Sequence, residues 1–196
     1  MKTYKSYEES GVSLIFGIGV ADASKTKNKK AYSVWYDMIF RCYSPKAKES
    51  FPTYSDCKVC DEWMTLSNFI EWHESNYIDG YSLDKDILKL DNKIYCPDFC
   101  RYVPNIVNAM TVRTNMSMDE SLTGASFNSA RNRWQAGCRN PLTKKNEYLG
   151  LFDSEDSAHL AWAKRKSEIA VEVCESISNL DPDILLAMKN RNFAEI

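Results

Sequence analysis

The first third of the chain carries apolar residues at helical spacing. Over 31–43 one side of such a helix is formed by Tyr32, Trp35, Tyr36, Ile39, Phe40 and Tyr43. This pattern predicts an amphipathic helix, and Ser44-Pro45 should end it because the residue before a proline disfavours helical backbone. A second helix is predicted near 66–75, with one side formed by Leu66, Phe69, Ile70 and His73.

Short extended segments occupy the middle of the chain. Residues 82–88 and 93–95 are typical of strands, and Asp91-Asn92 between them is typical of a turn, so the pattern favours a hairpin. A helix is predicted over 104–113 with Pro104 at its first position. Residues 114–121 are polar and are the best candidate for a linker.

The last third alternates between apolar and polar residues and then becomes helical. Strands are predicted over 131–139 and 147–152. Residues 153–156 supply an N-cap and acidic residues for the first turn of a long helix, whose apolar side is Ala158, Ala161, Trp162, Ile169 and Val173. A last helix over 182–191 begins after Asp181. The predicted fold class is therefore α+β.

Composition is that of a folded protein with one large domain or two small ones. The chain has 196 residues, of which 44% are apolar and 27% charged. The longest apolar run, Val12–Ile18, is far too short to span a bilayer, and the N-terminus lacks a signal-peptide core. We therefore expect a cytoplasmic protein with no membrane partner.

Charge is unevenly distributed beneath a formal net charge of −2. Residues 1–30 carry a net charge of +3 and residues 122–170 also carry +3, whereas residues 31–121 carry −5. The two basic segments favour contact with phosphate, although solvated faces would give the same pattern.

One predicted strand places its polar residues on a single face. Arg131, Arg133, Gln135 and Arg139 share parity, while Asn132, Trp134 and Ala136 point the other way, toward the helix. A bare sheet face with three arginines suits duplex DNA, since arginine binds phosphate or guanine and a small sheet fits the major groove. The alternative is that these arginines only coat a solvent face.

The same region resembles a known family. Gly124-Ala125-Ser126, Arg133–Ala136, Leu149–Asp153 and Ala158–Trp162 are similar to the Apetala-type DNA-binding domain, in which a three-stranded antiparallel sheet packs on one helix and reads DNA. The resemblance covers roughly a quarter of the chain, and Trp162 stands where the family usually has tyrosine. It implies a DNA-binding set of Arg131, Arg133, Trp134, Gln135, Arg139, Lys144, Lys145 and Tyr148.

The central segment resembles the phage HNH homing-endonuclease-like family, which commonly carries an Apetala-type domain at its C-terminus. The resemblance rests on Trp35–Tyr43, Tyr54, Cys57–Trp63, Leu83–Leu88 and Tyr102–Asn108. It implies a ββα-metal module that binds Mg²⁺ or Mn²⁺ and hydrolyses phosphodiesters, because a base must activate water beside a metal that stabilises the leaving oxygen.

The resemblance implies a metal and catalytic site built from Asp84, Lys85, Asn105 and Asn108. Asp84 stands at the ligand position, and Asn105 or Asn108 on the next helix completes the metal site, with Asn108 as the ligand. Lys85 replaces the general-base histidine, and a lysine of ordinary pKa is a poor base near neutral pH. The alternative for Asp84-Lys85-Asp86 is a solvated turn or an ion-paired strand end.

The chain has seven cysteines, an odd number that argues against a closed set of disulfides. Cys57 and Cys60 have the spacing of a zinc knuckle, and Cys96 and Cys100 lie downstream, so the four could close a structural Zn²⁺ site. Cys42 competes for the fourth place, and buried free thiols are the alternative. Cys138 and Cys174 are interpreted as structural.

The combined interpretation divides the chain into a basic arm over 1–30, an HNH-like module over 31–114, the Apetala-type domain over 122–174 and a C-terminal helix over 181–193. It predicts a phage DNA-binding protein that cleaves or nicks duplex DNA with a metal. The alternative is a catalytically degenerate relative that acts as a DNA-binding regulator or as an anti-defence protein bound to a host protein. The histidine missing at Lys85 separates the two.

Overall fold

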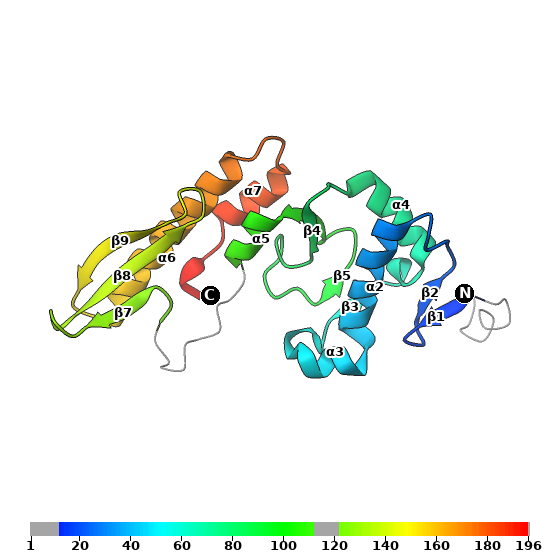
Figure 1. Ribbon diagram of the computed structural model, residues 1–196, viewed down its shortest axis with the longest axis horizontal. Helices are drawn as coiled ribbons and strands as arrows, with labels where there is room; N and C mark the ends of the chain where they lie inside the picture. Colours follow the sequence, from blue (N-terminus) through cyan, green and yellow to red (C-terminus); the bar gives the residue numbers. More distant parts are fainter. Residues whose placement is uncertain (1–11, 112–121, 196) are drawn as a thin grey trace. The chain divides into compact units, whose positions relative to one another are not determined.

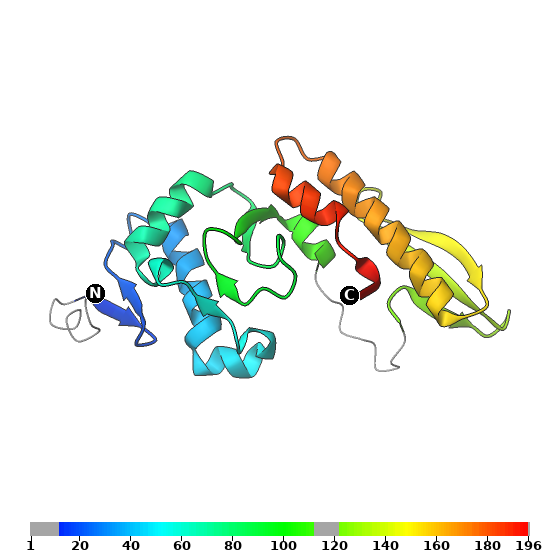
Figure 2. The ribbon, with the colours of Figure 1, turned by 180° about the vertical axis from the view of Figure 1, so that it is seen from behind.

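The computed structural model describes residues 12–111 and 122–195, which belong to two compact units, Met1–Val103 and Pro104–Ile196. Figures 1 and 2 show the elements of each unit from opposite sides. The predicted linker over 114–121 and the first part of the predicted basic arm lie outside the described residues. The fold is a mixture of helices and small sheets, so the predicted α+β class is confirmed.

The first unit is organised around two helices, α2 (Lys29–Tyr43) and α4 (Leu66–Asn76), which confirm the two predicted amphipathic helices. Its core cluster includes Trp35, Ile39, Trp63 and Phe69, all completely buried. The indole Nε1 of Trp35 donates to the carbonyl oxygen of Trp63 at 2.7 Å. This bond ties α2 to the turn before α4 in a region that water does not reach.

Shorter elements complete the first unit. They are β1 (Ser13–Ile15), β2 (Gly19–Ala21), α3 (Pro45–Ser50), β3 (Lys58–Val59), β4 (Tyr81–Asp84), β5 (Ile94–Tyr95) and β6 (Arg101–Pro104), with short 3₁₀ turns η1 (Pro52–Tyr54) and η2 (Glu62–Met64). The strands β1 and β2 form an antiparallel hairpin, β3 pairs with β5 in parallel, and β4 pairs with β6.

The pairing of β5 corrects the sequence prediction of a hairpin between residues 82–88 and 93–95. Strand β5 aligns Tyr95 with Val59 of β3, and both side chains are buried. Burial of this pair in the core selects β3 as the partner, whereas the alternation within each segment carried no information about which strand lies beside it.

The second unit is a three-stranded antiparallel sheet in the order β7 (Ala125–Asn128), β8 (Arg133–Asn140) and β9 (Lys145–Phe152). The long helix α6 (Glu155–Glu175) packs on one face of the sheet, as predicted, and Ala136 and Cys138 of β8 are buried beneath it. The unit also contains α5 (Asn105–Thr111), α7 (Pro182–Lys189) and the 3₁₀ turn η3 (Phe193–Glu195).

Local signals in the second unit act as the sequence predicted. The Ser154 hydroxyl caps α6 by accepting from the backbone N–H of Ser157 at 3.1 Å, and Glu155 and Asp156 occupy its first turn. Asp181 caps α7 by accepting from the N–H of Asp183 at 2.9 Å. Strand β8, however, begins at Arg133, because a tight turn with Asn132 at φ 51° precedes it. The prediction that Arg131 and Asn132 lie on the strand was therefore wrong.

None of the helices in the described part of the chain combines the length and apolar character that a bilayer crossing requires.

Candidate functional site

The face of the β7–β9 sheet that α6 does not cover carries polar and aromatic side chains. Arg139 is aligned with Asn146, Gly137 with Tyr148, and Ser126 with Gln135, so each pair shares this face. Tyr148 is 67% exposed, the largest exposure among the big apolar and aromatic side chains of the described residues. The predicted parity of β8 is confirmed from Arg133 to Arg139. We call this surface the open sheet face.

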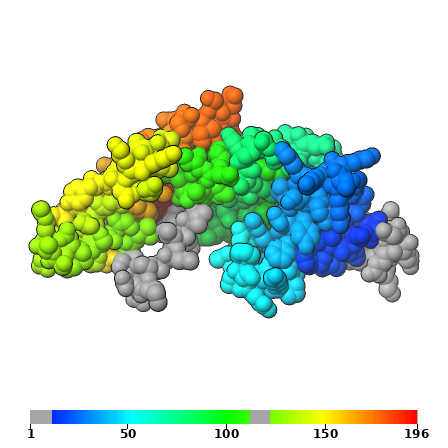
Figure 3. All heavy atoms as spheres, in the orientation of Figure 1, coloured from blue at the N-terminus to red at the C-terminus, as the bar shows by residue number. Residues whose placement is uncertain are grey.

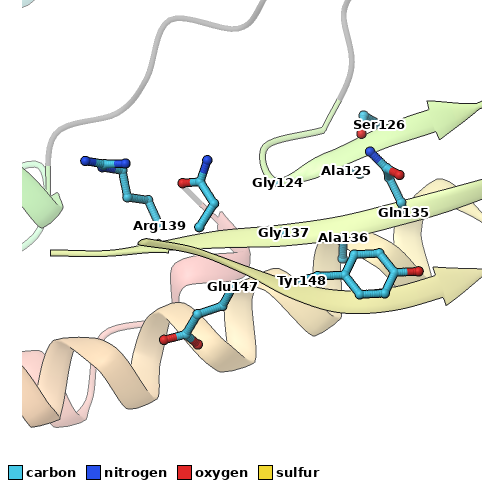
Figure 4. A pocket seen from close by; sticks show the side chains of 10 residues that line it. Gly124, Ala125, Ser126, Gln135, Ala136, Gly137, Arg139, Glu147 and Tyr148 are labelled. Carbon is cyan, nitrogen blue, oxygen red and sulfur yellow. The ribbon is translucent and has the colours of Figure 1, made fainter. Parts of the chain in front are cut away.

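A shallow depression of about 510 Å³ lies in the open sheet face. Gly137 forms part of its floor, since a side chain there would project from the middle of β8 into the depression. Figure 4 shows Arg139, Gln135 and Ser126 on one side of the strands, while Glu147 points the other way, toward α6. The depression therefore has a backbone floor and a rim of hydrogen-bonding side chains.

An irregularity in β9 determines which side chains reach this face. The register shifts between Ala136 and Gly137, so that Ala136 pairs with Gly150 but Gly137 pairs with Tyr148. Gly150 accommodates the bulge with φ +126°, which residues with a side chain rarely adopt. Tyr148 and Leu151 are three residues apart, so in a regular strand without the bulge they would lie on opposite faces, because side chains alternate along a strand.

Gly124 anchors the other end of the depression to the helix beneath. Its carbonyl oxygen accepts from the N–H of Gly137 at 3.1 Å. Its φ is +79°, and a Cβ atom there would lie 2.0 Å from Cγ of the buried Trp162 on α6. Only glycine fits, so this close approach fixes the height of the first strand above the helix.

The positive charges of the open sheet face differ in their availability. Arg139 and Arg131 form no ion pair with any residue of 12–111 or 122–195. Arg133 Nη2 lies 2.8 Å from Asp153 Oδ1, so its charge is partly neutralised. Lys144 and Lys145 are exposed at the turn between β8 and β9. Trp134 faces the helix side, where its ring meets Phe127 edge-on at 5.4 Å.

Arg165 of α6 holds the helix against the far side of the sheet. Its Nε donates to Glu147 Oε2 of β9 at 2.6 Å, and its Nη1 donates to Glu168 and Glu172. The hydrogen bond from Arg165 lowers the pKa of Glu147, and a further bond from Asn140 acts in the same direction. The network fixes β9 on the helix and leaves the open sheet face free for contacts.

The predicted catalytic segment is occupied by internal hydrogen bonds. Asp84 Oδ1 accepts from the backbone N–H groups of Asp86 at 2.7 Å and Ile87 at 2.6 Å. Burial raises the pKa of Asp84 above its usual value. One oxygen of the carboxylate thus shapes the turn after β4.

Lys85 is 6% exposed and is held on both sides. Its ammonium group donates to the two carboxylate oxygens of Asp86 at 2.7 and 2.6 Å and to the carbonyl oxygen of Asn92 at 2.7 Å. Burial works to lower the pKa of Lys85, but the hydrogen bond to Asp86, the charge of Asp86 and the nearby Cys57 and Tyr54 together outweigh it, and the pKa lies above its usual value. These contacts favour the ammonium form, whereas a general base needs a free amine.

The buried Asn92 closes the same loop and was not singled out as functional from the sequence. Its Nδ2 donates to the carbonyl oxygens of Lys85 at 2.9 Å and Ile94 at 2.7 Å. The sequence predicted a turn at Asp91-Asn92, which placed Asn92 in a loop. Only the structure shows that Asn92 is 5% exposed and hydrogen-bonded across that loop. Lys85 and Asn92 together stabilise the loop between β4 and β5.

The remaining metal candidates and Asp84 belong to different units. Asp84 belongs to the first unit, and Asn105 and Asn108 lie on α5 of the second unit, where Asn105 is exposed and Asn108 half-buried. His73 of α4 and His159 of α6 have hydrogen-bond partners of their own. The Nδ1 of His73 lies 2.6 Å from Tyr102 Oη, and Nδ1 of His159 lies 2.8 Å from the carbonyl oxygen of Thr123.

The four cysteines predicted to bind zinc do not form one metal-binding group within the described residues. Cys60 and Cys96 directly follow the paired strands β3 and β5, and the N–H of Cys100 donates to the carbonyl oxygen of Cys96 at 3.0 Å. Cys57 lies instead within electrostatic range of Cys42, and burial is the main cause that raises the pKa of Cys42 to about 12. Across 12–111 and 122–195, no three cysteine, histidine, aspartate or glutamate residues form a group suited to a metal ion. The described residues therefore do not provide the four-thiolate arrangement.

Two glycines that shape the backbone of the open sheet face were not identified as functional from the sequence. They are Gly137 and Gly150, and the sequence did contain a signal for them, because an isolated glycine within a strand marks a bulge or a close approach of another backbone.

Comparison with protein-family models, with curated proteins and with solved structures finds no match for the chain.

Proposed function

We propose that the chain binds duplex DNA through the open sheet face of its second unit. The observation that carries this proposal is the row of Arg139, Tyr148 and Gln135 around a depression with a glycine floor, on a sheet whose other face is covered by α6. The segment 122–170 carries a net charge of +3 within an acidic chain, which favours phosphate. A narrow antiparallel sheet can enter the major groove, where arginine and glutamine read base edges.

The structure supports separate roles for these side chains. Arg139 has no competing ion pair in the described residues, and Tyr148 is exposed enough to contact sugar or base. Gln135 accepts from Asn128 Nδ2 at 3.2 Å, which orients its amide across the face. Lys144 and Lys145 at the end of the hairpin suit phosphate contacts, which position a protein without reading sequence.

The test is a binding titration against duplex DNA at several salt concentrations. Arg139→Ala should weaken binding and lower the log–log salt slope by about 0.9 if the arginine contacts phosphate. Lys164→Ala removes the same charge from an exposed position of α6 and should leave affinity nearly unchanged. Equal effects of the two variants would show that only total charge matters, and the open sheet face would lose its role.

For the first unit we propose the catalytically degenerate alternative, in which the protein acts as a DNA-binding regulator or anti-defence factor. The hydrogen bonds of Asp84 Oδ1 and of the Lys85 ammonium support this choice, since they commit both groups to the loop. A plasmid-nicking assay with Mg²⁺ or Mn²⁺ tests it. Nicking by the parent protein that Asp84→Ala abolishes, while duplex binding persists, would establish the endonuclease interpretation instead.

A further inference from the structure

The first unit carries a row of aromatic rings along one side of α2, most of which do not pack against its core. Tyr32, Tyr36 and Phe40 follow one another at intervals of four residues along α2, so they lie on one side of the helix. The ring centroids of Tyr32 and Tyr36 are 6.0 Å apart, and those of Tyr36 and Phe40 are 6.4 Å apart with planes inclined by 10°. Phe16, from the turn between β1 and β2, adds a fourth ring at 5.7 Å from Tyr36 and 5.8 Å from Phe40.

Three of these rings lie outside the core of the unit. Of the four, only Tyr32 packs against the core cluster, whereas Phe16, Tyr36 and Phe40 contact one another. Phe16 is 38% exposed, and Tyr36 and Phe40 are half-buried. The space-filling view shows atoms of β1, β2 and α2, in blue, at the molecular surface (Figure 3). We call these four residues the aromatic row.

The backbone at Phe16 is strained in a way that places its ring in the row. Phe16 has φ 52° and is followed by Gly17 with φ 71°, a turn in which asparagine or glycine normally occupies the first position. A bulky residue in this region is an outlier, and such strain persists only where surrounding contacts compensate for it. Here the compensating contacts are the rings of Tyr36 and Phe40.

Lysines surround one end of the aromatic row. Four of them fall within six residues, Lys25, Lys27, Lys29 and Lys30. Lys25 Nζ lies 4.9 Å from the centre of the Tyr32 ring, and Lys30 Nζ forms an ion pair with Asp79 Oδ1 at 2.6 Å. Within the described ranges Lys27 and Lys29 have no acidic partner. Asp37, beside Tyr36, interacts with Arg41.

From this juxtaposition we infer that the aromatic row and the adjoining lysines bind single-stranded nucleic acid. Stacking on aromatic side chains needs unpaired bases, and lysines alongside neutralise the phosphates of the same strand. The unneutralised charge of Lys27 and Lys29 complements a phosphate backbone. The lysines alone would serve a duplex or an acidic peptide equally well, so the rings are what select a single strand. This surface lies in the first unit and is independent of the open sheet face.

The test is fluorescence anisotropy with labelled dT12 on the full chain carrying Arg139→Ala and Tyr148→Ala, so that binding through the open sheet face does not contribute. Within this background, Tyr36→Leu with Phe40→Leu keeps apolar bulk but removes two rings, and should weaken dT12 binding about tenfold or more. Phe51→Leu removes a 48% exposed ring elsewhere in the unit and is the matched control.

Two further variants separate charge from stacking. Lys25→Gln with Lys27→Gln should lower the log–log salt slope by about 0.7 for each lysine that meets a phosphate, whereas Lys46→Gln with Lys48→Gln on α3 makes the same charge change and should not. Phe16→Asn suits the turn and removes the ring, so weaker binding by this variant cannot be attributed to a disrupted hairpin.

The outcomes decide the inference. Tighter binding of dT12 than of a 12-base-pair duplex, lost with the two rings, supports it, and a parallel titration with U12 distinguishes DNA from RNA as the source of the strand. Undetectable dT12 binding, or binding that polyglutamate displaces as readily as unlabelled dT12 and that the ring variants leave intact, would overturn it in favour of a surface that senses charge alone.

Discussion

Gly124→Ala tests whether the contact between β7 and α6 is as close as the structure indicates. The new Cβ would lie 2.0 Å from Cγ and 2.2 Å from Cδ1 of Trp162, so either the indole or the strand must move. Trp162 is 8% exposed and cannot simply turn into solvent. The positive φ of +79° costs a residue with a side chain about 1–2 kcal/mol, and overpacking adds about 1–3 kcal/mol. We expect a total loss of about 2–5 kcal/mol, a large part of a typical domain's stability.

Gly80→Ala is the matched control, because Gly80 has the same φ of +79° but a Cβ there would meet nothing within 4 Å. It should cost only the conformational part, about 1–2 kcal/mol. Native-state hydrogen exchange measures both effects locally, on peptides of α6 for Gly124→Ala and of α4 for Gly80→Ala. Equal losses in the two variants would refute the reasoning, since the contact of Gly124 with Trp162 would then contribute nothing.

Four further predictions concern individual side chains. Asp153→Asn releases Arg133 from its ion pair, so duplex affinity in a salt titration should rise several-fold, and an unchanged or weaker affinity would remove Arg133 from the interface. Asn92→Ala deletes side-chain bonds to two buried-loop carbonyls and should cost about 1–3 kcal/mol in urea unfolding; a cost near zero would mean that the loop is stabilised elsewhere. Burial, and secondarily the charge of Lys30, lowers the pKa of His73 below its usual value near 6.5. The unfolded chain therefore binds a proton that the folded chain excludes, and the free energy of unfolding should be full above about pH 6.5 and fall as the pH drops through that value toward the lower folded pKa, a dependence that His73→Gln should flatten. The sequence predicts one zinc ion on Cys57, Cys60 and Cys100 with Cys96 or Cys42 as the fourth ligand, which elemental analysis of protein purified without chelator checks; a ratio near zero with unchanged melting after chelator treatment would leave these residues as free thiols.

The sequence predicted the four helices α2, α4, α6 and α7 with starts within a few residues of those observed, but it did not predict α3. These four helices carry apolar residues at a period near 3.6, and α6 and α7 begin at the capping residues Ser154 and Asp181. Both signals act between residues four positions apart or fewer, so they are complete within the local sequence. The parity that places Arg133, Gln135 and Arg139 on one face of β8 is local for the same reason.

Pairing and burial were decided by the tertiary structure. The two-residue strand β5 joins β3 rather than β4, because the core that buries Tyr95 and Val59 is assembled from residues far apart in the sequence. The sequence presented Lys85 in the place of a catalytic base, and only the folded loop brings its ammonium group to the carbonyl oxygen of Asn92. In the sequence Arg133 is equivalent to Arg139 of the same strand, and only the fold places Asp153 beside it. In each case the two contacting residues are not related by the repeat of a helix or a strand. Their contact therefore cannot be inferred from the sequence pattern, and only the folded chain brings them together.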